Sequence, residues 1–424
     1  MSRVINLFKH GLVKNSLIYT VSDAINKAVP FFILPVLSYY LVPADFGIVA
    51  NFNVLLAILT LLVPLGASTI LSVKFYKVSR EEFKKYVGTT IIIGLLSSIV
   101  LSLITLLFSD ILLKSFKLTL EIQLASIWIG LAALMTAMHL SIFRFQEKPV
   151  FFGVYGIFQT VVNVCVSLVL VICYKLGWIG RVEGIAVATI SFGVFSFFNL
   201  YKSNWISFNI SKALIHECLV FGLPLVPHSL SFWIRSSIDR ILITSFSGEA
   251  ETGLYSTGFQ FGLLVSFLTL SFNNAFSPFI LKNLSEENEL KLENNKRKLV
   301  KITYFILGGL LFCSLFFIIF SNYFLKYFFS PNYLAASKYI PWAILSQMFQ
   351  GFYLLVVNYI FFTKKTKQLA TITFSTALLQ IVLSYILINL YGGIGGAYST
   401  TIVSFLTFVF VFILSTKVYP MKWY

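Results

Sequence analysis

Residues 221–261 read FGLPLVPHSLSFWIRSSIDRILITSFSGEAETGLYSTGFQF. The apolar run at 219–245 is long enough to cross a bilayer as one helix. Pro224 and Pro227 interrupt it, because a proline inside a helix lacks the backbone N–H that the helix uses. The second half of the run carries three charged residues: Arg235, Asp239 and Arg240. Charges at bilayer depth are costly and usually functional, so this stretch predicts a proline-broken membrane helix at a functional site.

The whole chain shares this apolar character. Of its 424 residues, 58% are hydrophobic and 11% are charged, whereas a soluble domain has about 45–50% and about 25%. A barrel strand would show about 10 alternating residues, and the apolar runs here are longer and continuous. We therefore predict an all-α integral membrane protein with about 12 transmembrane helices. The predicted spans are approximately 16–42, 46–72, 86–109, 121–143, 150–174, 183–201, 219–245, 253–280, 300–321, 338–362, 367–390 and 394–416.

The basic residues indicate how these helices are oriented. The chain has 32 Lys and Arg against 16 Asp and Glu, a net charge of +16. With the N-terminus in the cytoplasm, 23 of the cations fall in cytoplasmic segments, 6 on the opposite side and 3 inside spans. This bias predicts cytoplasmic N- and C-termini. Topology and contact with anionic membrane lipids account for the positive charge, so we expect no nucleic-acid partner.

A second proline-containing span occupies the corresponding place near the N-terminus. It ends in an acidic turn, and aligning Gly47 with Gly253 superposes that turn on the one after the seventh span. Broken spans at matching positions of two halves are typical of transporter binding sites. We expect two pseudo-symmetric six-helix halves, residues 1–210 and 211–424, with helices 1 and 7 broken by proline.

The charges inside the spans are the candidate site residues. Asp23 and Lys27 are four residues apart in span one, as are Arg235 and Asp239 in span seven, so each pair shares a helix face. Such pairs could neutralise themselves or extend to the interface. Arg240 leaves one cation in excess, which would favour an anion such as a phosphate group in a water-filled cavity.

Four further polar or aromatic residues in the spans are candidate glycan contacts. Trp233 lies beside Arg235 and could stack on a sugar ring. Asn51, Asn53 and His228 could meet sugar hydroxyls. The alternative is that such side chains join helices through hydrogen bonds.

Several functional motifs are absent from the sequence. There is no GxxxxGK[ST] nucleotide loop, no GxSxG elbow and no metal-binding cluster of His, Cys and acidic residues. We therefore expect no bound cofactor or metal and no ATP-driven pump. Energy for transport would come from an ion gradient or from the gradient of the substrate itself. Asp23 and Asp239 are the carboxylates that could couple transport to H⁺ or Na⁺.

Residues 221–261 resemble the start of the second half in Wzx-type O-antigen and polysaccharide flippases of the multidrug/oligosaccharidyl-lipid/polysaccharide (MOP) exporter superfamily. The family typically has "GLPL-P…S-W…S-DR-IL…G…GLYS" there. The matching residues are Gly222, Pro224, Pro227, Trp233, Ser237, Asp239, Arg240, Gly253, Leu254 and Tyr255. The first-half stretch LPVLSYYLVPADFGIVANFNVL resembles the family less well, because Tyr40 lies where a basic residue is frequent and Asp45-Phe46 replaces Glu-Tyr.

This resemblance implies two six-helix bundles around a central cavity. It also implies an alternating-access flippase for surface polysaccharide and lipopolysaccharide biosynthesis. This flippase would move an undecaprenyl-pyrophosphate-linked oligosaccharide, the O-antigen repeat unit, from the cytoplasmic to the periplasmic leaflet of the bacterial inner membrane. Arg235, Arg240 and Lys27 would bind the pyrophosphate, and Asp23 and Asp239 would orient them or couple an ion. A polysaccharide polymerase and a chain-length regulator are the protein partners that it implies.

Two other functions remain open at this level. A cation-coupled multidrug exporter of the same superfamily usually carries cationic substrates, which the excess of buried cations disfavours. A membrane polysaccharide polymerase usually needs a sizeable outer loop with catalytic acids, and the longest such loop, about residues 322–337, has none.

Overall fold

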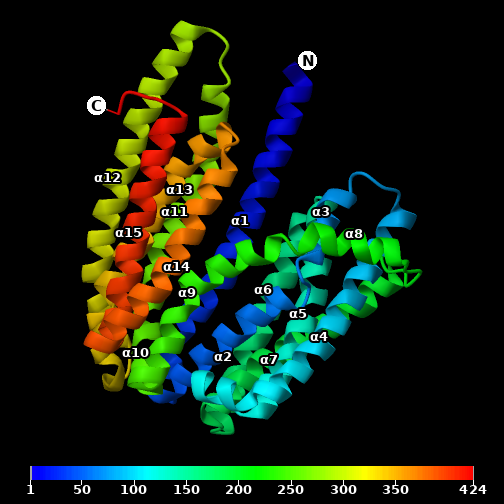
Figure 1. Ribbon diagram of the computed structural model, residues 1–424, viewed down its shortest axis with the longest axis vertical. Helices are drawn as coiled ribbons and strands as arrows, with labels where there is room; N and C mark the ends of the chain where they lie inside the picture. Colours follow the sequence, from blue (N-terminus) through cyan, green and yellow to red (C-terminus); the bar gives the residue numbers. More distant parts are fainter. Residues whose placement is uncertain (1, 424) are drawn as a thin grey trace. The chain divides into compact units, whose positions relative to one another are not determined.

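Helices form all the regular structure that the described part of the chain contains (Figure 1). The computed structural model describes residues 2–423, except for the side chains of residues 2–14, 16, 17, 27 and 275. Eleven helices are long and apolar enough to cross a membrane, or twelve if one bent pair counts as a single span. The predicted all-α membrane fold is confirmed, and it follows from the requirement that backbone polar groups in lipid bond within their own segment.

The chain divides into two compact units, Met1–Trp233 and Ile234–Tyr424. The first unit contains α1 (Ser2–Ser38), α2 (Pro43–Leu62), η1 (Ala67–Thr69), α3 (Ile70–Lys74), α4 (Arg80–Phe116), α5 (Leu120–Phe145), α6 (Pro149–Leu168), η2 (Val169–Cys173), α7 (Gly177–Lys202), α8 (Lys212–Gly222) and the start of α9 (Leu225–Ser247). The rest of α9 belongs to the second unit, followed by α10 (Glu249–Gln260), α11 (Gly262–Leu284), α12 (Glu289–Phe328), η3 (Pro331–Lys338), α13 (Ile340–Phe362), α14 (Thr366–Tyr391) and α15 (Gly393–Val418). The six-helix lobes 1–210 and 211–424 and their central cavity stay predictions.

Small residues bring the helices of the first unit together. α7 packs against α5 and α6, and α6 also packs against α1. A Cβ on Gly193 of α7 would lie 2.6 Å from the Cβ of Ala132 in α5, so these two helices touch through their backbones. In lipid, where apolar burial between helices gains little, such close approach is a main source of helix association.

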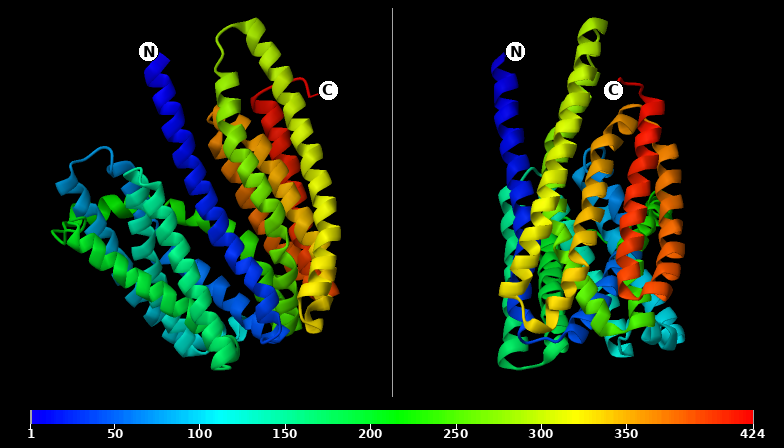
Figure 2. Two further views of the ribbon diagram at one scale, coloured as in Figure 1. Left: turned by 180° about the vertical axis from the view of Figure 1, so that it is seen from behind. Right: turned by 90° about the vertical axis from the view of Figure 1, so that its left-hand side faces the viewer.

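The second unit is built around α13. This helix packs against α11 on one side and α15 on the other, and α14 covers α15 (Figure 1). α12 is 40 residues long, and its first turns extend past the helices beside it (Figure 2). Those turns hold the charged sequence that begins at Glu289, which water solvates more readily than lipid would.

The two proline-containing spans differ in the structure. Pro30 and Pro35 lie inside α1, which continues over both as one helix, so the broken form expected for helix 1 is not confirmed. Membrane helices tolerate proline where neighbouring groups satisfy the freed carbonyls. In the seventh span α8 and α9 are separate helices, and their axes differ by 42°.

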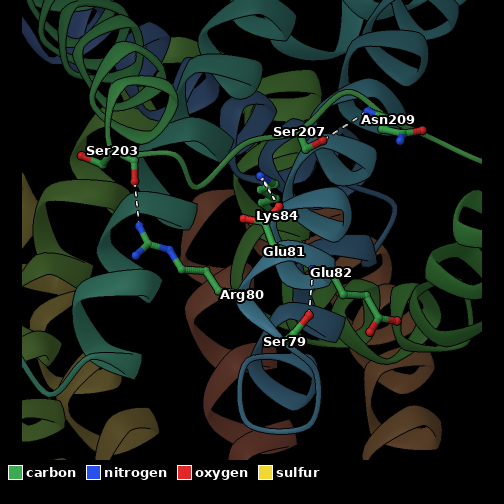
Figure 3. A network of polar contacts seen from close by, with 8 residues as sticks. All are labelled: Ser79, Arg80, Glu81, Glu82, Lys84, Ser203, Ser207 and Asn209. Carbon is green, nitrogen blue, oxygen red and sulfur yellow. Dashed lines mark hydrogen bonds and ion pairs between the residues drawn. The ribbon is translucent and has the colours of Figure 1, made fainter.

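The segment between α7 and α8 is fastened to the start of α4 (Figure 3). The Arg80 guanidinium donates to the Ser203 carbonyl at 2.8 Å and lies 4.3 Å from the centroid of the Trp205 ring. The Ser207 amide donates to the Lys84 carbonyl at 3.0 Å. A Cβ on Gly88 would lie 2.1 Å from the Ser207 carbonyl oxygen, so only glycine lets this segment lie so close to α4.

α8 is held on the same unit by an ion pair and a glycine contact. Glu217 accepts from Lys74 at 2.5 Å and from the Tyr86 hydroxyl at 2.6 Å. This hydrogen bond to the carboxylate raises the pKa of Lys74 above its ordinary value. At the end of α8 a Cβ on Gly222 would lie 2.6 Å from the backbone nitrogen of Ala67. The first unit therefore fixes α8 as far as the bend that precedes α9.

We expect the Gly222→Ala variant to be less stable than the parent protein by about 1–3 kcal/mol, since the added methyl group must displace backbone. The measurement is the apparent melting temperature of the purified protein in detergent. Gly308→Ala is the matched control, because a Cβ there meets no atom of the described chain within 4 Å. Equal melting temperatures for the two variants would contradict the proposed backbone contact.

Candidate substrate and coupling site

Among the charged residues of the predicted site whose side chains the structure describes, Asp239 of α9 is the most buried, with 3% of its surface exposed. No Lys, Arg or His side chain that the structure describes lies within 4 Å of its carboxylate, so its neighbour Arg235 does not pair with it. Hydroxyl and amide groups surround it instead. The donors to the carboxylate are Tyr255 Oη at 3.0 Å, Gln380 Nε2 at 3.0 Å, Ser384 Oγ at 2.5 Å, Ser399 Oγ at 3.5 Å and Thr400 Oγ1.

This Asp239 cluster, residues 239, 255, 380, 384, 399 and 400, joins four helices of the second unit. Tyr255 comes from α10, Gln380 and Ser384 from α14, and the last two residues from α15. A buried carboxylate needs such donors when it is ionised. The same oxygens are of the kind that hard cations prefer, so the cluster can hold a proton or a small cation in place of part of its hydrogen bonds.

The two arginines of α9 contact different helices and neutral partners. Arg235 donates to Gln350 Oε1 of α13 at 3.1 Å. Arg240 donates to Ser256 Oγ of α10 at 3.2 Å and to the Ser236 carbonyl at 2.5 Å. Both are partly buried, and no carboxylate of the described side chains lies within 4 Å of either. Their charges are therefore hydrogen-bonded but not neutralised.

The charged pair of span one is only partly described. Asp23 is exposed on α1. The side chain of Lys27 lies outside the described residues, so its pairing with Asp23 stays a prediction. Among the described residues no group of three or more His, Cys, Asp and Glu side chains could hold a metal ion.

The candidate glycan contacts divide into two kinds. Asn51 has no exposed surface, and its amide donates to the Phe116 carbonyl at 3.0 Å, which joins α2 to the end of α4. Trp233 is partly buried and donates to the Val54 carbonyl of α2 at 3.1 Å. Asn53 and His228 are exposed. Asn53 and His228 are therefore accessible to a ligand, whereas the side chain of Asn51 is buried and bonded to the Phe116 carbonyl.

Sequence reasoning missed Arg181, which it counted among the cations outside the spans. The structure places Arg181 inside α7, where its Nη1 donates to Asn163 Oδ1 and to Ser167 Oγ, each at 2.6 Å. Because Arg181 lies near the start of an apolar run, the sequence alone did not show that it belongs to the helix. It also missed Ser384, Ser399 and Thr400, because hydroxyl residues are common in membrane helices and carry no spacing signal.

Known proteins share this fold and part of this sequence. A family model described as polysaccharide biosynthesis protein matches residues 12–284, and a second, MatE, matches residues 224–386. The Lsg locus putative protein 1 of Haemophilus influenzae is 25% identical over 403 residues, covering 91% of this chain and 95% of that protein.

Two solved structures have a similar fold. A multidrug resistance MATE family transporter of the MOP superfamily, in an inward-facing conformation, matches with a TM-score of 0.72 and 14% identity, over 93% of this chain and 94% of that one. The lipid II flippase MurJ, in an inward closed conformation, also has a TM-score of 0.72, with 18% identity over 96% of this chain and 89% of that one. The predicted resemblance is confirmed. Since the first family model covers more than half of the sequence, the chain belongs to the polysaccharide biosynthesis protein family, and it shares its fold with transporters and flippases of known structure.

Proposed function

We propose that this protein is a flippase for an undecaprenyl-pyrophosphate-linked oligosaccharide, such as an O-antigen repeat unit. It would move this lipid from the cytoplasmic to the periplasmic leaflet of the bacterial inner membrane by alternating access, with both of its own termini cytoplasmic. Membership of the polysaccharide biosynthesis protein family supports this substrate class. The similar fold of a lipid II flippase supports the same kind of cargo.

The observation that carries the proposal is the uncompensated charge of Arg235 and Arg240. Each guanidinium in a membrane helix costs at least about 2.5–3.5 kcal/mol on insertion scales. Their partners Gln350 and Ser256 satisfy single hydrogen bonds but leave the charges in place. A pyrophosphate would neutralise both and would accept the paired hydrogen bonds that a guanidinium fork offers. Lys27 would be a third cation for this group.

The Asp239 cluster suits the coupling step. Its carboxylate is ringed by neutral donors from α10, α14 and α15, so H⁺ or Na⁺ binding there would change contacts among several helices at once. Such a change can bias a transporter between two conformations. Asp23 is the second candidate carboxylate. Asn53 and His228, which are exposed, and Trp233 would be the glycan contacts, whereas Asn51 is fully buried. A polymerase and a chain-length regulator would be the downstream partners.

Export of cationic drugs is the second candidate function, because the MatE model matches residues 224–386. The arginines of α9 disfavour it, since like charges repel in a medium of low dielectric constant. Deleting the gene should leave drug susceptibility unchanged and abolish surface polysaccharide. Increased drug susceptibility with normal polysaccharide would favour the exporter.

Replacing Arg235 and Arg240 together with Ala should reduce surface polysaccharide at least about tenfold, because two charged hydrogen-bond donors to the substrate are lost. The measurement is polysaccharide per cell in a strain that depends on this protein, at matched protein level in the membrane. Arg297→Ala is the control, since that arginine is exposed on the charged start of α12. Full polysaccharide in the double variant would rule out these arginines as the pyrophosphate site.

The Asp239→Asn variant should lose the dependence of transport on an ion gradient, because an amide cannot exchange a proton or hold a cation as a carboxylate does. The protein is placed in vesicles with an imposed Na⁺ or H⁺ gradient, and the translocation rate of a fluorescent lipid-linked oligosaccharide is followed. Asp110→Asn serves as the control, since Asp110 is exposed on α4. An unchanged response to the gradient in Asp239→Asn would contradict a coupling role.

A further inference from the structure

Arg181 is a cation inside the first unit that the proposed mechanism does not use. It lies in the second turn of α7, a helix that is long and apolar enough to span the membrane. Its Nη1 donates to Asn163 Oδ1 and to Ser167 Oγ of α6, each at 2.6 Å. One nitrogen of the guanidinium therefore makes both hydrogen bonds to described residues, and Nε and Nη2 make none with them.

The side chain points away from the nearer end of its helix. An arginine near a helix end normally extends toward that end, and the Cα–Cβ bond of a helical residue also leans toward the N-terminus. Arg181 reaches the other way. A Cβ on Gly180 would lie 3.0 Å from the backbone of Leu170, which places the start of α7 beside that residue. From there Arg181 extends to Ser167 and Asn163, deeper along α6.

Both acceptors of Arg181 lie within the candidate span Pro149–Cys173. Ser167 is six residues and Asn163 ten residues before its end at Cys173. The guanidinium is therefore bonded to the body of this span and not to its last turn.

Arg181 is held in a fixed position but is not neutralised. A Cβ on Gly184 would lie 2.2 Å from Ser167 Oγ, so α6 and α7 touch directly beside the arginine. Its two acceptors are neutral, and no carboxylate of the described side chains lies within 4 Å of it. Part of its surface remains accessible. The free edge formed by Nε and Nη2 is the edge with which a guanidinium binds two oxygens of one oxyanion.

We propose that Arg181, oriented by Asn163 and Ser167, is a second phosphate-binding site for the lipid-linked substrate, located in the first unit and separate from the arginines of α9. This inference rests on the proposed function. Asn163 and Ser167 are positioning residues, because they contact the arginine and not the phosphate.

The test measures binding of farnesyl pyrophosphate to purified protein in detergent. The parent protein should show two classes of farnesyl pyrophosphate site, and in Arg181→Gln the affinity of one of them should fall at least about tenfold, since a charged donor pair is lost there while the arginines of α9 are intact. Gln can still donate to Asn163 or Ser167, so the ligand-free melting temperature should not fall. Arg181→Lys, which keeps the charge without the fork, should give an intermediate affinity, and Arg297→Gln should bind as the parent protein does.

Each other outcome has a definite meaning. If Arg181→Gln binds farnesyl pyrophosphate as the parent protein does, the inference fails at any melting temperature while the proposed function stands, and a lower melting temperature would then show that Arg181 only joins α6 to α7. If the variant loses binding of phosphatidylglycerol vesicles and not of farnesyl pyrophosphate, the site belongs to a bilayer lipid and the inference is overturned. If the parent protein binds farnesol as tightly as farnesyl pyrophosphate, both the inference and the proposed function are overturned.

Discussion

In lipid every polar group must find its partner within the protein or in a ligand, because no water is present to solvate it. The backbone meets this requirement by forming helices, and the described chain contains no other regular element. Side chains meet it in two different ways. The carboxylate of Asp239 is surrounded by donors from three further helices. The guanidinium groups of Arg235, Arg240 and Arg181 bond to neutral oxygens and keep their charge.

The proposed anionic cargo rests on the charge that these guanidinium groups keep. A buried cation without a counter-charge destabilises a protein unless something else repays the cost. For a transporter a ligand can do so, and its binding then favours the conformation that presents the cations best. The carboxylate of Asp239 also lacks a cation within 4 Å among the described side chains, but five neutral side chains donate to it. For this reason we propose a coupling role for Asp239 and not the cargo site.

Apolar runs of about 20 residues predicted the membrane helices well, since hydrophobicity over a whole span is a strong signal. The charges of span seven also marked α9 as the helix of the candidate site, and the structure shows Asp239 buried there. The surroundings of those charges could not be predicted. The partners of Asp239 come from positions 141 and 161 residues further along the chain, at Gln380 and Thr400, and nothing in their local sequence marks them.

Two misjudged features have physical causes. Arg181 lies where an apolar run begins, so counting charges along the sequence assigned it to a loop. In the structure Gly180 and Gly184 bring α6 close to α7, and Arg181 bonds to α6. Pro30 and Pro35 were expected to break the first helix, but α1 continues over them. A proline removes one hydrogen bond and frees one carbonyl, and in a membrane helix that loss is tolerated where neighbours compensate it.

The most direct measurement is the rate at which the protein, reconstituted in vesicles, translocates two lipids that carry the same oligosaccharide. One has a pyrophosphate linker, and the other has a neutral linker of similar length. If arginines without a counter-charge select the cargo, the protein should accelerate the translocation of the pyrophosphate-linked lipid and not of the other lipid. Equal acceleration of both lipids would show that the arginines do not select the cargo by its charge.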